Sequence, residues 1–164
     1  MYKWLLLGIV LALEVGCLGP SLSLVPSICL GPPFPWETSR SFQQALRSEP
    51  ESEALERARI DYLLERISKS PYNFLRNGSR YTGKQAGTHF RWKYFLNRGR
   101  VKTAQEFIDK VTTRSKRSGW PYQIQFPDRR RYPLRPLLLQ ELNFFDQTLE
   151  KKRRLTAEVR EKAP

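Results

Sequence analysis

The sequence predicts an α+β fold of about four helices packed on a small antiparallel sheet, which consists of a hairpin and one further strand. Apolar residues recur at the helical period in several segments, and Asn77-Gly78 is a strong two-residue turn sequence between short β-prone runs. Apolar residues also alternate with polar ones from Tyr122 to Phe126, as in a half-buried strand. The chain has 164 residues, of which 40% are hydrophobic, so we expect one small domain with a modest core.

The first predicted helix runs from about residue 52 to residue 69. Ser52 can cap its start and Pro71 stops it. The hairpin follows over residues 73–82, because both central positions of its Asn-Gly turn require a positive φ angle. Four apolar residues form the inner stripe of the first helix: Ile60, Leu63, Leu64 and Ile67.

Two capping-box patterns predict the next two helices. Thr82-x-x-Gln85 opens a helix from residue 83 to about residue 97, and Thr103-x-x-Glu106 opens another that continues toward Ser118-Gly119. After the strand, Pro136 fits the first turn of a last helix, whose apolar stripe ends at Leu149. Beyond Leu149 the chain is highly charged, and we expect it to fray.

The segment before the helices resembles an export region. Residues 1–23 are predicted to be a secretory signal, with an apolar run of ten residues from Trp4 to Leu13. Lipidation at Cys17 and an uncleaved N-terminal anchor remain open alternatives, and Cys17 and Cys29 form no disulfide framework within a domain. Residues 24–50 are predicted to be a proline-rich linker, 51–150 a single α+β domain and 151–164 a charged tail.

The charge of the chain is strongly positive and concentrated in its centre. The net charge is +13, and residues 66–135 contain 18 Lys or Arg against three acids. No acidic residue lies between Glu65 and Glu106. A basic surface implies an acidic partner, such as nucleic acid, anionic lipid headgroups or an acidic polymer. A solvated basic face without a fixed partner is the alternative.

Several motifs in the centre of the chain are similar to a known family. They are Phe74-x-Arg76-Asn77-Gly78, Ala86-x-x-His89-Phe90-x-x-Lys93-Tyr94, Lys102-Thr103-Ala104-x-x-Phe107-Ile108-Asp109-Lys110-Val111 and Ser115-x-x-Ser118-Gly119-x-Pro121-Tyr122. In this order they resemble the YfeK-like small exported bacterial proteins, over roughly residues 56–126. The resemblance implies export to the bacterial envelope and one small α+β domain. It implies no reaction, because the family has no assigned function.

No motif in the sequence identifies a reaction. The weak candidates for catalysis are His89, the only histidine, with Ser115 and Ser118, and a hydrolase-like site would need a hydrogen bond between them and a group that orients the imidazole. The alternative is that His89 locks its helix to a neighbouring loop. We expect no metal site, since one histidine and few acids cannot supply the ligands, and no cofactor.

A non-catalytic binding module is therefore the favoured function. The expected partner is an anionic envelope component or another envelope protein. We expect the protein to be a monomer that contacts the membrane at most peripherally or through an N-terminal anchor. Nucleic-acid binding through the basic aromatic run Arg91-Trp92-Lys93-Tyr94-Phe95 is a weaker alternative, since export argues against it. The predicted binding residues are Arg76, Arg80, Lys84, Arg91, Lys93, Arg98, Arg100 and Lys102.

Overall fold

A computed structural model of the chain describes residues 30–31 and 36–162. The predicted secretory signal, Cys17 and Cys29, and most of the proline-rich run lie outside these residues. The described elements occur in the order η1 (Trp36–Thr38), α1 (Arg40–Arg47), α2 (Glu53–Lys69), β1 (Asn73–Arg76), β2 (Ser79–Tyr81), α3 (Gly83–Asn97), α4 (Ala104–Phe107), the π-helix η2 (Ile108–Thr112), β3 (Gln123–Gln125), β4 (Arg131–Pro133) and α5 (Leu134–Glu161).

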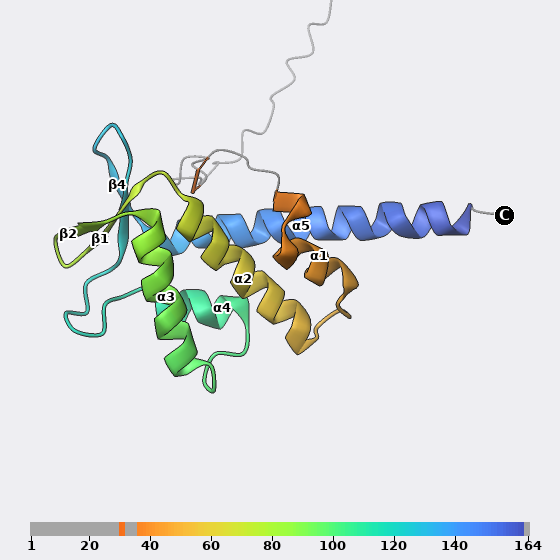
Figure 1. Ribbon diagram of the computed structural model, residues 1–164, viewed down its shortest axis with the longest axis horizontal. Coiled ribbons are helices and arrows are strands. Elements are labelled where there is room, and N and C mark those ends of the chain that lie inside the picture. Colours follow the sequence, from red (N-terminus) through yellow and green to blue (C-terminus); the bar gives the residue numbers. More distant parts are fainter. Residues whose placement is uncertain (1–29, 32–35, 163–164) are drawn as a thin grey trace, which may run out of the picture.

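The predicted α+β class is confirmed, with two elements that the prediction lacked. In the described part of the chain, five α-helices accompany a four-stranded antiparallel sheet in the order β2-β1-β3-β4. The Asn-Gly hairpin forms as predicted: Phe74 pairs with Tyr81, and Asn77 and Gly78 have φ angles of 50° and 81°. The helices lie on one side of the hairpin, and α5 runs along the whole assembly (Figure 1).

The core joins the helices to the sheet. Buried aromatic side chains come from α1, α2 and α5, where the ring centroids of Phe42 and Phe145 are 5.5 Å apart and those of Tyr62 and Phe145 are 4.5 Å apart. From α4, Phe107 is fully buried and packs edge-on against Tyr94 of α3. This core is a single cluster that extends from α1 to the strands β1 and β3.

A buried ion pair connects α2, α5 and the segment before η1. The Arg66 guanidinium donates two hydrogen bonds of 2.9 Å to the Glu141 carboxylate, one to each oxygen. The Tyr62 hydroxyl and the backbone N–H of Leu30 donate to the same carboxylate at 3.0 and 2.9 Å. Burial of a charged pair is tolerated when all its polar atoms are satisfied in this way.

The secondary structure differs from the prediction in three helices. Residues 40–47, expected in an extended linker, form α1, which packs on α2 and α5. The helix opened by Thr103 ends at Thr112 rather than near Ser118, since the hydroxyls of Thr112 and Thr113 both donate to the Ile108 carbonyl. Residues 150–161 continue α5 beyond the other elements instead of fraying (Figure 1).

Candidate functional site

Helix α3 is the element on which most of the predicted binding residues lie. Its start is fixed by the predicted capping box, in which Thr82 accepts from the backbone N–H of Gln85 and the Gln85 side chain accepts from that of Thr82. The helix lies so close to α2 that a Cβ on Gly83 would be 2.4 Å from the Ser70 carbonyl oxygen. No acidic residue occurs in α3. The sequence of α3 therefore determines where the helix starts, how closely it packs on α2 and which charge it carries.

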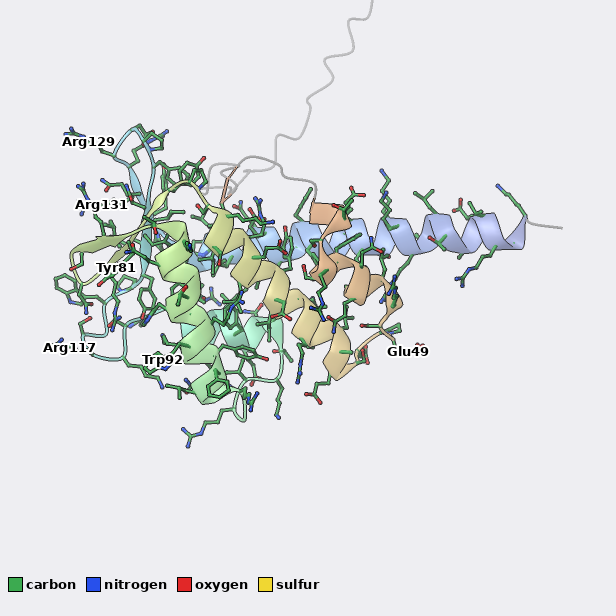
Figure 2. All side chains as sticks on the ribbon, viewed as in Figure 1. Glu49, Tyr81, Trp92, Arg117, Arg129 and Arg131 are labelled. Atoms are coloured by element: carbon green, nitrogen blue, oxygen red, sulfur yellow. The ribbon has the colours of Figure 1, made fainter. Side chains whose placement is uncertain are left out.

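The side of α3 that faces away from α2 exposes large apolar side chains. Trp92, Phe95 and Leu96 are each 58% exposed, although a soluble helix normally turns polar residues to water. Figure 2 shows Trp92 on the outer side of the helix. The Arg98 guanidinium lies 4.7 Å from the centre of the Phe95 ring, which is a cation–π distance. We call this set, together with exposed Arg91, the α3 outer face: Arg91, Trp92, Phe95, Leu96 and Arg98.

The structure divides the eight predicted binding residues among several places. Arg91 and Arg98 belong to the α3 outer face, and Arg100 and Lys102 follow it as exposed residues of the next loop. Arg76 and Lys84 line a pocket between the hairpin and α3. Arg80 lines a different groove, with Arg129 and Arg131. The eight residues thus lie on the hairpin, on α3 and in the loop after α3, with Arg76 on β1 and Arg80 on β2.

Lys93 is buried and cannot belong to an exposed basic surface. Its ammonium group donates to the Val111 carbonyl, to the Arg114 carbonyl at 3.4 Å and to the Tyr122 hydroxyl at 3.3 Å. Burial, assisted by the positive charges of Lys116 and Arg76, lowers its pKa to about 8. Lys93 thus ties α3 to the segment of residues 111–122 and has a structural position.

The His89 side chain forms a hydrogen bond with Tyr122 rather than with the predicted partners Ser115 and Ser118. Its Nε2 atom lies 3.3 Å from the Tyr122 hydroxyl, which is also hydrogen-bonded to Ser115. The Lys93 ammonium can only donate to Tyr122, and the tautomer of His89 decides whether Nε2 accepts from the Tyr122 hydroxyl or donates to it. Ser118 instead donates to Asn77 at the hairpin turn. No carboxylate among the described residues orients His89, so this arrangement favours the predicted locking role over a hydrolase-like site.

The pKa of His89 provides a test of that role. Burial of the imidazole is the largest cause of the change in its pKa, followed by the positive charges of Arg76 and Lys93. Together they lower the pKa of His89 to about 4. An unfolded chain binds the proton near pH 6.5, so the unfolded state gains protons first as the pH falls. The stability of the wild type should therefore decrease from about pH 7 to pH 4 relative to His89→Gln, which cannot titrate there. We expect a relative loss on the order of 1 kcal/mol, after allowance for solvent screening of this part-exposed group.

Urea denaturation of both proteins at pH 7, 5.5 and 4 measures this difference. The glutamine amide can still form a hydrogen bond with Tyr122, so the local contact is kept. All other titratable groups are the same in the two proteins, and a difference between their pH profiles therefore reports on His89. Parallel pH profiles would show that the imidazole charges equally in both states and would contradict the structural role.

A pocket beside His89 was not predicted from the sequence. It has a volume of about 400 Å³ and lies between the hairpin and the first half of α3. Its walls come from residues that are distant in sequence, such as Phe74, Tyr81, Phe90 and Tyr122. Only the pairing of β1 with β2 and β3 brings them together, so no local pattern could have revealed the pocket.

Comparison with known proteins places the chain in a family. Residues 54–146 match the family of unknown function DUF5329, which covers more than half of the chain, so the protein belongs to this family. It is also 40% identical over 70 residues to the uncharacterized protein YfeK of Salmonella typhimurium, which confirms the resemblance described above. The match covers 42% of this chain and 58% of that protein. No solved structure matches the chain.

Among residues 30–31 and 36–162, no helix combines the length and the apolar character needed to cross a bilayer. In the same part of the chain, no three His, Cys, Asp or Glu side chains lie close enough together to hold a metal ion.

Proposed function

We propose that this protein is an exported, non-catalytic binding module of the bacterial envelope, and that its α3 outer face binds anionic membrane surfaces peripherally. One observation carries the proposal: three large apolar side chains are exposed within five residues, between arginines that have no ion pair among the described residues. Contiguous exposed apolar side chains of this kind mark binding surfaces.

The chemistry of the face suits the boundary between lipid headgroups and acyl chains. Tryptophan is enriched at that boundary, and Trp92 would place its apolar ring there with its N–H toward the headgroups. Arginine contributes about 1 kcal/mol per residue near an anionic surface. Arg91, Arg98, Arg100 and Lys102 are exposed on and just after the helix, so electrostatic attraction of several kcal/mol is available at low salt.

The apolar residues favour a membrane over other anionic partners. An acidic polymer in solution would use the arginines but would offer no apolar phase for Trp92, Phe95 and Leu96. Single-stranded nucleic acid could stack on Trp92 and Phe95, and this alternative is an outcome of the experiment below. Leu96 has no role in stacking, however, and inserts naturally beside Trp92 in a lipid interface.

Cosedimentation with lipid vesicles tests the proposal. Vesicles of phosphatidylglycerol should pull down the protein at 0.05 M salt, neutral phosphatidylcholine vesicles should not, and binding should weaken strongly toward 1 M salt as the Debye length falls to about 3 Å. The variant Arg91→Glu/Arg98→Glu should lose at least tenfold in affinity. The variant Trp92→Ser/Phe95→Ser should also lose affinity, although its charge is unchanged.

A matched charge reversal at the far end of the molecule is the control. Lys151→Glu/Arg160→Glu makes the same change of four charges on α5, where both residues are exposed. It should bind almost as well as the wild type. If both double reversals weaken binding equally, only net charge matters and the α3 outer face is not a site. Salt-sensitive binding to oligothymidine without binding to anionic vesicles would replace the proposal by the nucleic-acid alternative.

A further inference from the structure

We propose that the pocket between the hairpin and α3 binds a small amphipathic acid: a carboxylate or phosphate group held near Arg76, attached to an apolar body that lies against the aromatic walls. This site adjoins the α3 outer face where the rings of His89 and Trp92 lie 6.3 Å apart, but Trp92 does not line it, and it would bind a soluble molecule in the absence of a membrane. Four properties of the pocket carry the inference: its size, the state of Arg76, the lack of acidic groups and the nature of its walls.

The size of the pocket is that of a site for a small molecule. Its volume of about 400 Å³ falls within the range of roughly 300–1,000 Å³ that is typical of ligand pockets. Its floor and one wall are rigid, because Phe74 pairs with both Tyr81 and Ile124 in the sheet and Phe90 is buried in α3. The cavity is therefore formed before any ligand enters it.

Arg76 is a half-buried cation at the wall of this pocket. Its Nε atom is buried and has no hydrogen-bond partner among the described residues. No ion pair of its guanidinium is found in the same part of the chain, and its positive charge acts on His89, Lys93 and Tyr122. A buried, unpaired donor costs about 1–3 kcal/mol, more when it is charged, so a shift of the Arg76 side chain that presents Nε–H to an oxyanion in the pocket would recover this loss.

The charges around the pocket favour an anionic ligand over a cationic one. None of its lining residues is an Asp or Glu, and Lys84 adds a second cation at the start of α3. His89 is neutral near pH 7 because its pKa is lowered to about 4, so it can act as a hydrogen-bonding group without charge. A cationic ligand would find no partner here, whereas an anion would be attracted by Arg76, Lys84 and Lys93.

The remaining walls are suited to an apolar body. Four aromatic rings, those of Phe74, Tyr81, Phe90 and Tyr122, line the pocket together with Leu75 and Ala86. Burial of apolar surface contributes about 25 cal/mol per Å², so a chain or ring in this space adds affinity that a free inorganic anion lacks. Polar groups are few and lie beside the rings, an arrangement that fixes the orientation of an amphipathic ligand.

Calorimetry with decanoate, decyl phosphate, decanol and inorganic phosphate tests the proposal on the full chain without vesicles. Decanoate and decyl phosphate, used below their micelle concentrations, should bind at one site. Decanol, which has the same body without the charge, and inorganic phosphate, which has the charge without the body, should each bind at least tenfold more weakly. Arg76→Gln should reduce the affinity for decanoate tenfold or more, and Arg80→Gln, which removes an arginine from the other groove, should leave it unchanged.

Nuclear magnetic resonance on the wild-type protein covers the case in which Arg76→Gln does not fold. Decanoate should shift the Arg76 Nε–Hε resonance and give nuclear Overhauser contacts from its alkyl chain to the ring of His89, the only histidine in the sequence. Binding of decanol equal to that of decanoate, or contacts to Trp92 instead of His89, would overturn the proposal.

The same measurements separate this proposal from the membrane proposal. Trp92→Ser/Phe95→Ser should lose vesicle binding and keep decanoate binding. Arg76→Gln should lose decanoate binding and keep vesicle binding. The acidic group of the natural ligand could belong to a free acid or to a lipid, and lysophosphatidylglycerol distinguishes the two. If it competes with decanoate, the pocket accepts a lipid. If it does not compete, the pocket is restricted to free acids.

Discussion

Replacing Glu141 by alanine is expected to lower the free energy of unfolding by roughly 3–5 kcal/mol, the typical cost of removing one partner from a buried ion pair. Glu141 and Arg66 are each 5% exposed, and the carboxylate accepts four hydrogen bonds: two from Arg66 nitrogens, one from the Tyr62 hydroxyl and one from the Leu30 backbone N–H. Without it, the guanidinium stays buried and keeps a bond of 3.3 Å to the Gly31 carbonyl, but it loses its carboxylate counterion. Chemical denaturation monitored by circular dichroism measures the loss.

The exposed ion pair of the same helix is the matched control. Glu150 pairs with Arg154 one turn apart, and both side chains are mostly exposed. Because such pairs contribute about 0–1 kcal/mol, Glu150→Ala should change the stability little. A loss below 1 kcal/mol for Glu141→Ala would mean that water reaches Arg66, and it would contradict the packing of α5 against α2.

Phe107→Ala is expected to cost roughly 3–5 kcal/mol, since it removes a fully buried ring and leaves a cavity. The ring packs at 5.7 Å from Tyr94 and links α4 to α3. Phe95→Ala is a control with the same chemical change at a side chain that is 58% exposed, and it should cost less than 1 kcal/mol. Equal losses in the two variants would show that the assignment of core and surface on α3 is wrong.

Local sequence patterns were sufficient for the elements that carry strong start and stop residues. Residues 83–97 form α3 as the Thr82 capping box predicts, and the Asn77-Gly78 turn has the expected positive φ angles. Helix α1 was missed because it is only eight residues long and mostly polar, so its docking on α2 and α5 decides its conformation. Strand β4 was missed because its sequence, Arg131-Tyr132-Pro133, is typical of an edge strand and lacks an apolar alternation.

The candidate site was less accessible to prediction than the fold. The sequence places His89 and Lys93 one helical turn apart, but it cannot show that Lys93 is buried against carbonyls of the 111–114 segment. The helical period does separate Tyr94, which follows Ala86 and Phe90 at intervals of four and packs on the core, from the exposed Trp92 and Phe95. The burial of Lys93, in contrast, depends on tertiary contacts that no local pattern shows.

The insertion depth of Trp92 tests the membrane proposal most directly. A variant that keeps Trp92 and has phenylalanine in place of Trp4, Trp36 and Trp120 reports on this residue alone. With phosphatidylglycerol vesicles, its emission should shift to shorter wavelength and should be quenched by lipids brominated on their acyl chains, and both effects should disappear at 1 M salt. An emission spectrum that stays unchanged while the protein cosediments with the vesicles would contradict the account, because binding would then occur through another surface.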